Sequence, residues 1–173
     1  MRIIGIDNGL DGGVVVIDET GRVLEKHIAP VLDEGKGKRV YDVPAMVRIL
    51  VGYGATMQPV NEKSFAYLER AQAMPKQGVS STFSIGFGFG LWQGILHTLQ
   101  IPHAIVGPRQ WQDEMFRGID KTNTKRASAL VASRLSPGTD WRATERSRVP
   151  HDGLTDAFCI AEYGRCRQTT SHH

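Results

Sequence analysis

The sequence predicts an α/β protein with a mixed five-stranded sheet and helices on both faces of that sheet. Two patterns indicate this fold class. Near the N-terminus, residues 2–7, 13–18 and 22–30 are apolar runs joined by glycine-containing turns, as in an antiparallel meander. Further along, residues 65–69 and 103–107 are short apolar runs that alternate with helical patterns, as in βαβα units. An antiparallel ribbon followed by such units makes the sheet mixed.

The first strands are recognised by their composition and by the turns after them. Residues 2–7 read RIIGID, a buried strand that ends on Asp7, and residues 13–18 read GVVVID. The Asn-Gly and Asp-Gly-Gly segments between them favour turns. The stretch from Leu32 to Arg39 carries charges of both signs and two glycines, so we predict an exposed loop there.

Helical patterns fill the rest of the chain. Residues 43–53 carry apolar side chains at positions i, i+3, i+4, i+7 and i+8, and Pro44 stands in the first turn, where its missing N–H costs little. Residues 80–99 predict a longer helix entered through Ser80 or Ser81. Glycines in the first half of that helix are tolerable where another backbone or a ligand comes close. Three more helices are predicted, over residues 108–116, 122–135 and 152–166.

Length and composition fit one globular domain. The 173 residues are 40% hydrophobic and 8% aromatic, and we expect a single domain over residues 1–167 with a tail over residues 168–173. No run of about 18 apolar residues predicts a membrane span. The N-terminus lacks the features of a signal peptide, so we expect an intracellular protein. Cys159 and Cys166 stand about two helical turns apart without a CxxC motif, so neither a disulfide nor a zinc site is expected.

Basic side chains gather in three clusters, although the net charge is only +3. A single cluster is typical of a solvated surface. Three clusters in predicted loops and helix starts favour contact with phosphates. Their members are Lys36, Lys38 and Arg39; Lys121, Lys125 and Arg126; and Arg142, Arg146 and Arg148.

Two carboxylates stand at the ends of predicted strands. Asp7 ends the first strand, and Glu69 ends the strand over residues 65–69. Ligands of open α/β folds bind outside the carboxyl ends of the strands. An acid at a strand end can also serve only to cap a turn, and for Asp7 alone the two interpretations have equal weight.

The final predicted helix adds two more carboxylates. Asp152 and Asp156 are four residues apart, so both project from one face, where like charges are destabilising unless a cation lies between them. Asp152 can also be explained as a cap that suits the helix dipole. Asp156 lies among apolar neighbours, and a carboxylate in such a segment needs a metal or a hydrogen-bond partner. Carboxylates with few histidines select Mg²⁺, for which Mn²⁺ is expected to substitute.

Three segments together resemble the RuvC family of Holliday-junction resolvases, in the ribonuclease H-like superfamily. They are IIGIDNG at the N-terminus, YLERAQAMPKQGVSS in the middle and HDGLTDAFCIAEYG at the end. The likeness is greatest to the divergent branch of phages, bacteria and chloroplasts, and it covers nearly the whole chain. It implies a homodimer that binds a four-way DNA junction and makes paired symmetric nicks with two metal ions. No small-molecule cofactor and no membrane partner are expected.

The same resemblance assigns the site. Asp7, Glu69, Asp152 and Asp156 are the expected metal ligands and catalytic acids, and His151 is an alternative to Asp152. Lys121 is an expected catalytic residue that neutralises the scissile phosphate. The expected DNA-binding residues combine members of the first two basic clusters with residues that the resemblance adds. They are Lys36, Lys38, Arg39, Lys121, Lys125 and Arg126 from the clusters, and Lys76, Gln77, Ser80 and Ser81 from the resemblance. Phe83, Phe87 or Phe89 is a candidate wedge between bases, with the core and the dimer interface as alternatives.

Other functions remain to be distinguished. A nuclease on RNA–DNA hybrids or on branched and flap DNA would use the same acids. An inert DNA-binding module predicts loss of at least one acid, and all four are present. A sugar-kinase fold normally needs a second domain, which 173 residues do not accommodate. A resolvase is expected in the cytoplasm with the nucleoid if the source is bacterial or a phage, and in an organelle if it is eukaryotic.

Overall fold

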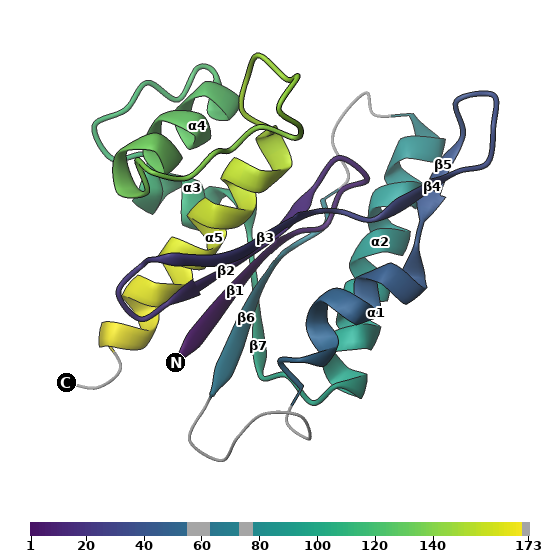
Figure 1. The fold of residues 1–173 in the computed structure, drawn as a ribbon, viewed down its shortest axis with the longest axis horizontal. Helices are drawn as coiled ribbons and strands as arrows, with labels where there is room; N and C mark the ends of the chain where they lie inside the picture. The colour runs from purple at the N-terminus through teal and green to yellow at the C-terminus, as the bar shows by residue number, and fades with distance from the viewer. Residues whose placement is uncertain (55–62, 73–77, 171–173) are drawn as a thin grey trace.

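The computed structural model describes residues 1–54, 63–72 and 78–170 (Figure 1). The strands are β1 (Arg2–Asp7), β2 (Gly13–Asp18), β3 (Val23–Ile28), β4 (Val31–Asp33), β5 (Arg39–Tyr41), β6 (Ser64–Glu69) and β7 (His103–Val106). The helices are α1 (Val43–Val51), α2 (Val79–Thr98), α3 (Pro108–Met115), α4 (Thr124–Leu135) and α5 (Asp152–Thr170). In this part of the chain, no helix has the length and apolar character that a membrane crossing requires.

Five of the strands form one mixed sheet in the order β3-β2-β1-β6-β7. β1 pairs antiparallel with β2, and β2 pairs antiparallel with β3, so the predicted meander is confirmed. β1 and β6 are parallel neighbours, and so are β6 and β7. The predicted fold class is therefore confirmed.

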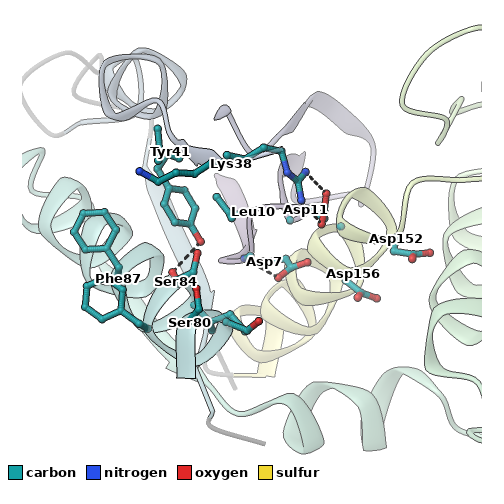
Figure 2. Close-up of a pocket in the computed structure, with 18 of the residues that line it drawn as sticks. Asp7, Leu10, Asp11, Lys38, Tyr41, Ser80, Ser84, Phe87, Asp152 and Asp156 are labelled. Carbon is teal, nitrogen blue, oxygen red and sulfur yellow. Dashed lines mark hydrogen bonds and ion pairs between the residues drawn. The ribbon is translucent and has the colours of Figure 1, made fainter. Parts of the chain in front are cut away.

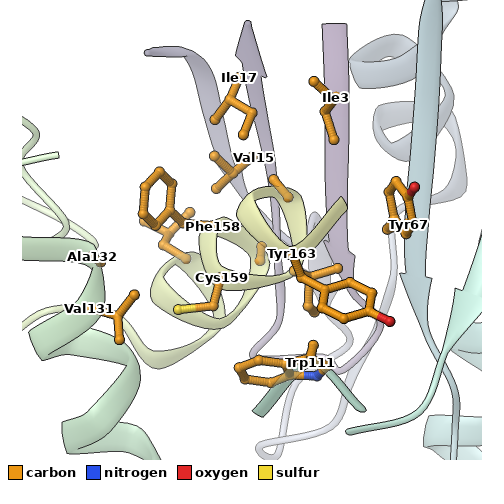
Figure 3. Packing of buried hydrophobic residues seen from close by; sticks show 14 of the residues in the cluster. Ile3, Val15, Ile17, Tyr67, Trp111, Val131, Ala132, Phe158, Cys159 and Tyr163 are labelled. Carbon is orange, nitrogen blue, oxygen red and sulfur yellow. The ribbon is translucent and has the colours of Figure 1, made fainter. Parts of the chain in front are cut away.

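Helices cover both faces of this sheet, because side chains of each strand point alternately to the two sides. Figure 1 shows α3, α4 and α5 on one side of the sheet and α1 and α2 on the other. On β1, Ile3 belongs to the core that includes residues of α3, α4 and α5, while Ile4 and Ile6 belong to the core that includes residues of α1 and α2. Figure 3 shows the first of these cores, in which Phe158 and Cys159 of α5 lie between the sheet and α4. Both cores are closed to solvent at their centres.

α5 lies directly against the central strand. A Cβ atom added to Gly5 of β1 would stand 2.0 Å from the backbone oxygen of Ala157. At the start of α5, a Cβ atom added to Gly153 would stand 2.2 Å from the backbone oxygen of Asp11. The missing side chains therefore let the helix reach both β1 and the turn that follows it, and this contact brings the start of α5 to the end of β1.

One segment differs from the expectation. The stretch from Leu32 to Arg39, predicted as a loop, contains the two-stranded hairpin β4–β5, in which Val31 pairs with Tyr41 and Asp33 with Arg39. Its tip contains three consecutive residues with positive φ, Gly35, Lys36 and Gly37. The sequence does not predict these two strands, because an exposed hairpin buries little apolar surface and its charges of both signs are typical of a loop. The final helix is also longer than predicted, since α5 continues to Thr170 and not only to residue 166.

Candidate active site

Asp7 and Glu69 lie side by side at one edge of the sheet. β1 and β6 are parallel, and Ile6 pairs with Leu68, so the next residue of each strand is a carboxylate at the carboxyl end. The Asn8 side chain joins the two strand ends, because its amide nitrogen donates to the backbone oxygen of Glu69 over 2.7 Å. Adjacent strand ends therefore position both acids as the sequence predicted.

The start of α5 supplies the other two acids. Asp156 accepts a hydrogen bond from the Ser128 hydroxyl of α4. Asp152, one turn earlier, forms an ion pair of 2.6 Å with the Lys125 ammonium, and its side chain is 45% exposed. The two acids of α5 thus differ: one is held by a neutral hydroxyl in a partly buried position, and the other is paired with a cation at the surface.

Three of the four acids have strongly raised pKa values. Burial raises the pKa of Asp7 to about 7, and the neighbouring charge of Glu69 adds to the shift. Burial also raises the pKa of Glu69 to about 7, with a contribution from the charge of Asp156. The pKa of Asp156 is about 7 for the same first reason, and the charges of Asp7 and Asp152 raise it further. These carboxylates are close enough to repel one another, and the described residues around them do not fully compensate their charge.

Two cavities meet at the acids. The first, of about 890 Å³, is lined by Asp7, Asp152 and Asp156 and opens between the β4–β5 hairpin and the start of α2 (Figure 2). The second, of about 1020 Å³, is lined by Asp7, Glu69 and Asp156 and opens toward α3. Asp7 and Asp156 line both cavities, so the acids lie where one hollow passes into the other.

The donor set fits a hard divalent cation. In the described ranges, no group of three or more His, Cys, Asp or Glu side chains already converges on one point as a finished metal site. The four acids instead surround the junction of the two cavities, and all of their ligating atoms are oxygens, which Mg²⁺ and Mn²⁺ prefer. Mutual repulsion among buried carboxylates is the condition that a bound cation relieves. Asp7, Glu69, Asp156 and Asp152 would hold it.

His151, the alternative to Asp152, has a different environment. Burial lowers the pKa of its imidazole, and its Nδ1 atom is buried without a hydrogen-bond partner among the described residues. Its backbone N–H donates to the Trp141 oxygen over 2.7 Å. Asp152 lines the first cavity, whereas His151 lines neither cavity. The geometry therefore favours Asp152 for contact with a cation.

The predicted DNA-binding residues of the hairpin lie beside the acids. Lys38 and Arg39 line the first cavity, while Lys36 stands at the exposed tip. Arg39 forms two hydrogen bonds, of 2.6 and 3.0 Å, with the carboxylate of Asp11 in the turn after β1. Lys38 pairs with Glu34 over 2.6 Å within the hairpin. Both cations are exposed at the edge of the first cavity.

The second predicted cluster divides between two places. Lys125 lines the first cavity next to Asp152, and Arg126 is exposed on the following position of α4. Lys121 pairs with Asp113 over 2.8 Å and is not among the residues that line either cavity. Of the two lysines, Lys125 is the one beside the acids.

Ser80 and Ser81 line the first cavity at the start of α2. Lys76 and Gln77 fall outside the described residues.

Several residues at the site are not predicted by the sequence. Trp111 donates its indole N–H to Glu69 over 2.7 Å, and Ser128 donates to Asp156. Arg70 and Arg109 line the second cavity and give it positive charge. The sequence around each of them carries no motif, although Arg70 is marked by its position next to Glu69. Asp11, which the sequence predicts only as a turn residue, binds Arg39 at the edge of the first cavity.

The candidate wedge residues of α2 fall into two groups. Phe83 and Phe87 are 72% and 51% exposed, and their rings stack with centroids 6.1 Å apart. Phe89 packs against the core on the α1 and α2 side of the sheet. The first two remain available to DNA or to a second chain.

The mixed sheet, with helices on both faces and acids at its carboxyl edge, defines the chain as an α/β protein. Among solved structures, the chain is similar to T. thermophilus RuvC in complex with Holliday junction substrate, with 16% identity over 98% of this chain and 96% of that chain and a TM-score of 0.60. A second Thermus thermophilus RuvC structure matches with 18% identity over 98% and 97% of the two chains and a TM-score of 0.61. No family model and no curated protein matches the sequence. The chain therefore has the RuvC fold.

Proposed function

We propose that the protein is a divalent-metal-dependent endonuclease that resolves Holliday junctions by paired symmetric nicks. The observation that carries this proposal is that Asp7, Glu69 and Asp156 line the same cavity at the carboxyl edge of a RuvC-type sheet. A solved neighbour with this fold was determined with a Holliday junction substrate. The acids account for the chemistry, and the neighbour supports the choice of substrate.

In the proposed reaction the acids bind the cations and a lysine beside them contacts the phosphate. Asp7, Glu69, Asp156 and Asp152 would bind the cations, Mg²⁺ or Mn²⁺. When bound, a pair of such ions activates water and stabilises the leaving oxygen of a phosphodiester. Lys125, which is 70% exposed beside Asp152, is placed to neutralise a phosphate that enters the first cavity.

The two cavities supply a path for a DNA strand. Lys38 and Arg39 flank the acids on the hairpin side, and Arg70 and Arg109 flank them on the α3 side. Phosphates are spaced along a strand, so cations on both sides of the acids hold the backbone while the phosphate between them is cut. This arrangement suits a single strand crossing the edge of the sheet.

The exposed face of α2 supports the proposal that the protein is a homodimer. Val79, Phe83 and Phe87 of this helix are 88%, 72% and 51% exposed. A Cβ atom added to Gly90 or Gly94 would meet nothing within 4 Å, so these glycines leave the helix backbone open to close approach. A second copy packed there would bring two sets of acids to one junction, as paired nicks require.

The decisive experiment compares substrates for the wild type and two variants. Synthetic four-way junction, flap, duplex and RNA–DNA hybrid are incubated with Mg²⁺ under one condition. We expect wild type to cut the junction, and Asp7→Asn to bind the junction with unchanged affinity but to cut it at least ~100-fold more slowly. The control Glu145→Gln removes an exposed acid that lines neither cavity and should cut normally.

Three outcomes would contradict the proposal in different ways. Normal cutting by Asp7→Asn rejects the acidic metal site. Equal cutting of all four substrates rejects junction selectivity. Preference for the hybrid or the flap replaces the resolvase by the other nuclease that uses the same acids.

A further inference from the structure

The indole of Trp111 donates a hydrogen bond directly to Glu69, one of the proposed metal ligands. The Trp111 side chain comes from α3, is 1% exposed, and donates its N–H to Oε1 of Glu69 over 2.7 Å. Its ring packs edge-to-face on Phe116, with centroids 5.4 Å apart. The indole is thus held by the core while its one polar atom points at the acidic edge of the sheet.

The other two tryptophans provide a contrast within the same chain. Trp92 and Trp141 are also buried, at 0% and 4% exposed, and their indole N–H groups have no hydrogen-bond partner among the described residues. The bond from Trp111 to Glu69 is a particular feature of the acidic site.

In the described part of the chain, Glu69 accepts hydrogen bonds from two side chains. Only one of them reaches the carboxylate, so the other carboxylate oxygen is free in this part of the chain. The Asn8 amide holds its backbone oxygen, and the Trp111 indole holds Oε1. Both donors are neutral, so the full negative charge of the carboxylate remains for a cation. Asp156 is held in the same manner by the neutral Ser128 hydroxyl. A lysine or arginine in either place would compete with the cation for that charge.

We propose that Trp111 is a positioning residue that orients Glu69 toward a bound divalent cation, a proposal that rests on the metal-dependent function above. The partners of metal ligands fix the orientation of those ligands, and their removal typically weakens metal binding or activity by 10–100-fold. Without the indole N–H, the Glu69 side chain is free to rotate, and the cation must order it on binding.

The test measures Mn²⁺ binding without DNA, from the electron paramagnetic resonance signal of free Mn²⁺. Trp111→Phe keeps an aromatic ring against Phe116 and removes the N–H. We expect it to bind Mn²⁺ at least ~10-fold more weakly than wild type. Trp92→Phe and Trp141→Phe are matched controls, because each replaces a buried indole that does not contact the acids by the same smaller ring. Both variants should bind Mn²⁺ within about twofold of wild type.

Cleavage of the junction then separates positioning from loss of structure. For Trp111→Phe, the Mn²⁺ concentration at half-maximal rate should rise at least ~10-fold, while the rate at saturating Mn²⁺ stays near that of wild type. A damaged fold would instead lower the rate at every Mn²⁺ concentration. Equal Mn²⁺ affinity of Trp111→Phe and wild type overturns the proposal and leaves the proposed function intact.

A second set of variants retains Trp111 and so does not depend on the stability of Trp111→Phe. The chain has three tryptophans, and Trp92→Phe with Trp141→Phe leaves Trp111 as the only one. Its fluorescence should be quenched by Mn²⁺, and the added substitution Glu69→Gln should abolish the quenching. Quenching that survives Glu69→Gln overturns the proposal. Absence of Mn²⁺ binding by wild type overturns both this proposal and the metal-dependent function.

Discussion

The candidate acids carry their charge in two ways. Asp152 is partly exposed and paired with Lys125. Asp7, Glu69 and Asp156 are more enclosed, and burial raises the pKa of each to about 7. A folded protein in which a carboxyl has a raised pKa holds its proton more tightly than the unfolded chain. The resulting stabilisation is complete below the unfolded pKa and is lost as the pH rises through about 7. Without metal, the site therefore destabilises the fold at alkaline pH.

Asp156→Asn tests this directly. The amide has a similar shape and still accepts from Ser128, but it cannot ionise beside Asp7. In EDTA at pH 8 we expect the variant to unfold with a free energy at least ~1 kcal/mol above that of wild type, since one pKa unit corresponds to about 1.4 kcal/mol. The difference should shrink toward pH 5, where Asp156 is already protonated. Denaturant unfolding at both pH values measures it.

Asp152→Asn is the control for that prediction. It removes an exposed ion pair with Lys125, and such pairs contribute about 0–1 kcal/mol. A gain in stability of Asp156→Asn that is the same at pH 5 and pH 8 would show that relief of charge is not its cause.

At the scale of elements, the β4–β5 hairpin carries most of the cations that face the first cavity. Arg39 ties it to the turn after β1 through Asp11, yet both side chains are exposed, at 42% and 75%. The pair therefore contributes little to stability, and a phosphate can take the place of Asp11. We therefore expect the hairpin to contribute to DNA binding rather than to the stability of the fold.

Lys38→Ala combined with Arg39→Ala should separate these roles. We expect the free energy of unfolding to change by less than about 1 kcal/mol. Each lost phosphate contact reduces the slope of log affinity against log salt by about 0.9, so the slope for junction binding should fall by about 1.8. Arg48→Ala with Arg134→Ala removes two exposed cations that line neither cavity, and its slope should equal that of wild type. An unchanged slope for the hairpin variant would place DNA elsewhere.

The elements also show how far the sequence predicts the fold and the site. Strands and helices that bury an apolar face, such as β1 and α1, follow from periodicity, and Asp7 and Glu69 follow from their places at strand ends. The hairpin does not, because its stability depends on pairing between exposed polar residues. Trp111 and Ser128 could not be assigned to the site, because their partners lie 42 and 28 residues away and only the packing of α3 and α4 brings them together.

For the whole molecule, we expect a second copy of the chain to pack on the exposed side of α2. A second copy of the chain predicts that Phe83→Glu with Phe87→Glu gives a monomer, because an interface there would bury charges without partners, at a cost of several kcal/mol per ion. Analytical ultracentrifugation measures the change in mass. The monomer should still bind Mn²⁺, since neither residue is among the four acids, while paired nicking of a junction is lost.

Leu135→Glu is the matched control, because Leu135 is 52% exposed on α4 and Phe87 is 51% exposed on α2. It should leave the mass unchanged. A wild-type protein that is monomeric at micromolar concentration, alone and on a junction, would contradict the dimer and leave the site to make single nicks.

The contact between Gly5 and Ala157 joins two residues from opposite ends of the described chain. During synthesis on the ribosome, β1 emerges before α5, so it has no cover on the α5 side until that helix has left the exit tunnel. Asp156 arrives with that same helix. A growing chain thus displays Asp7 and Glu69 without the third acid until α5 has emerged, so the proposed cutting activity begins only after that helix has packed on the sheet. We expect chains released before α5 to cut no DNA. Because α5 does not cover one face of their sheet, we also expect them to be readily degraded.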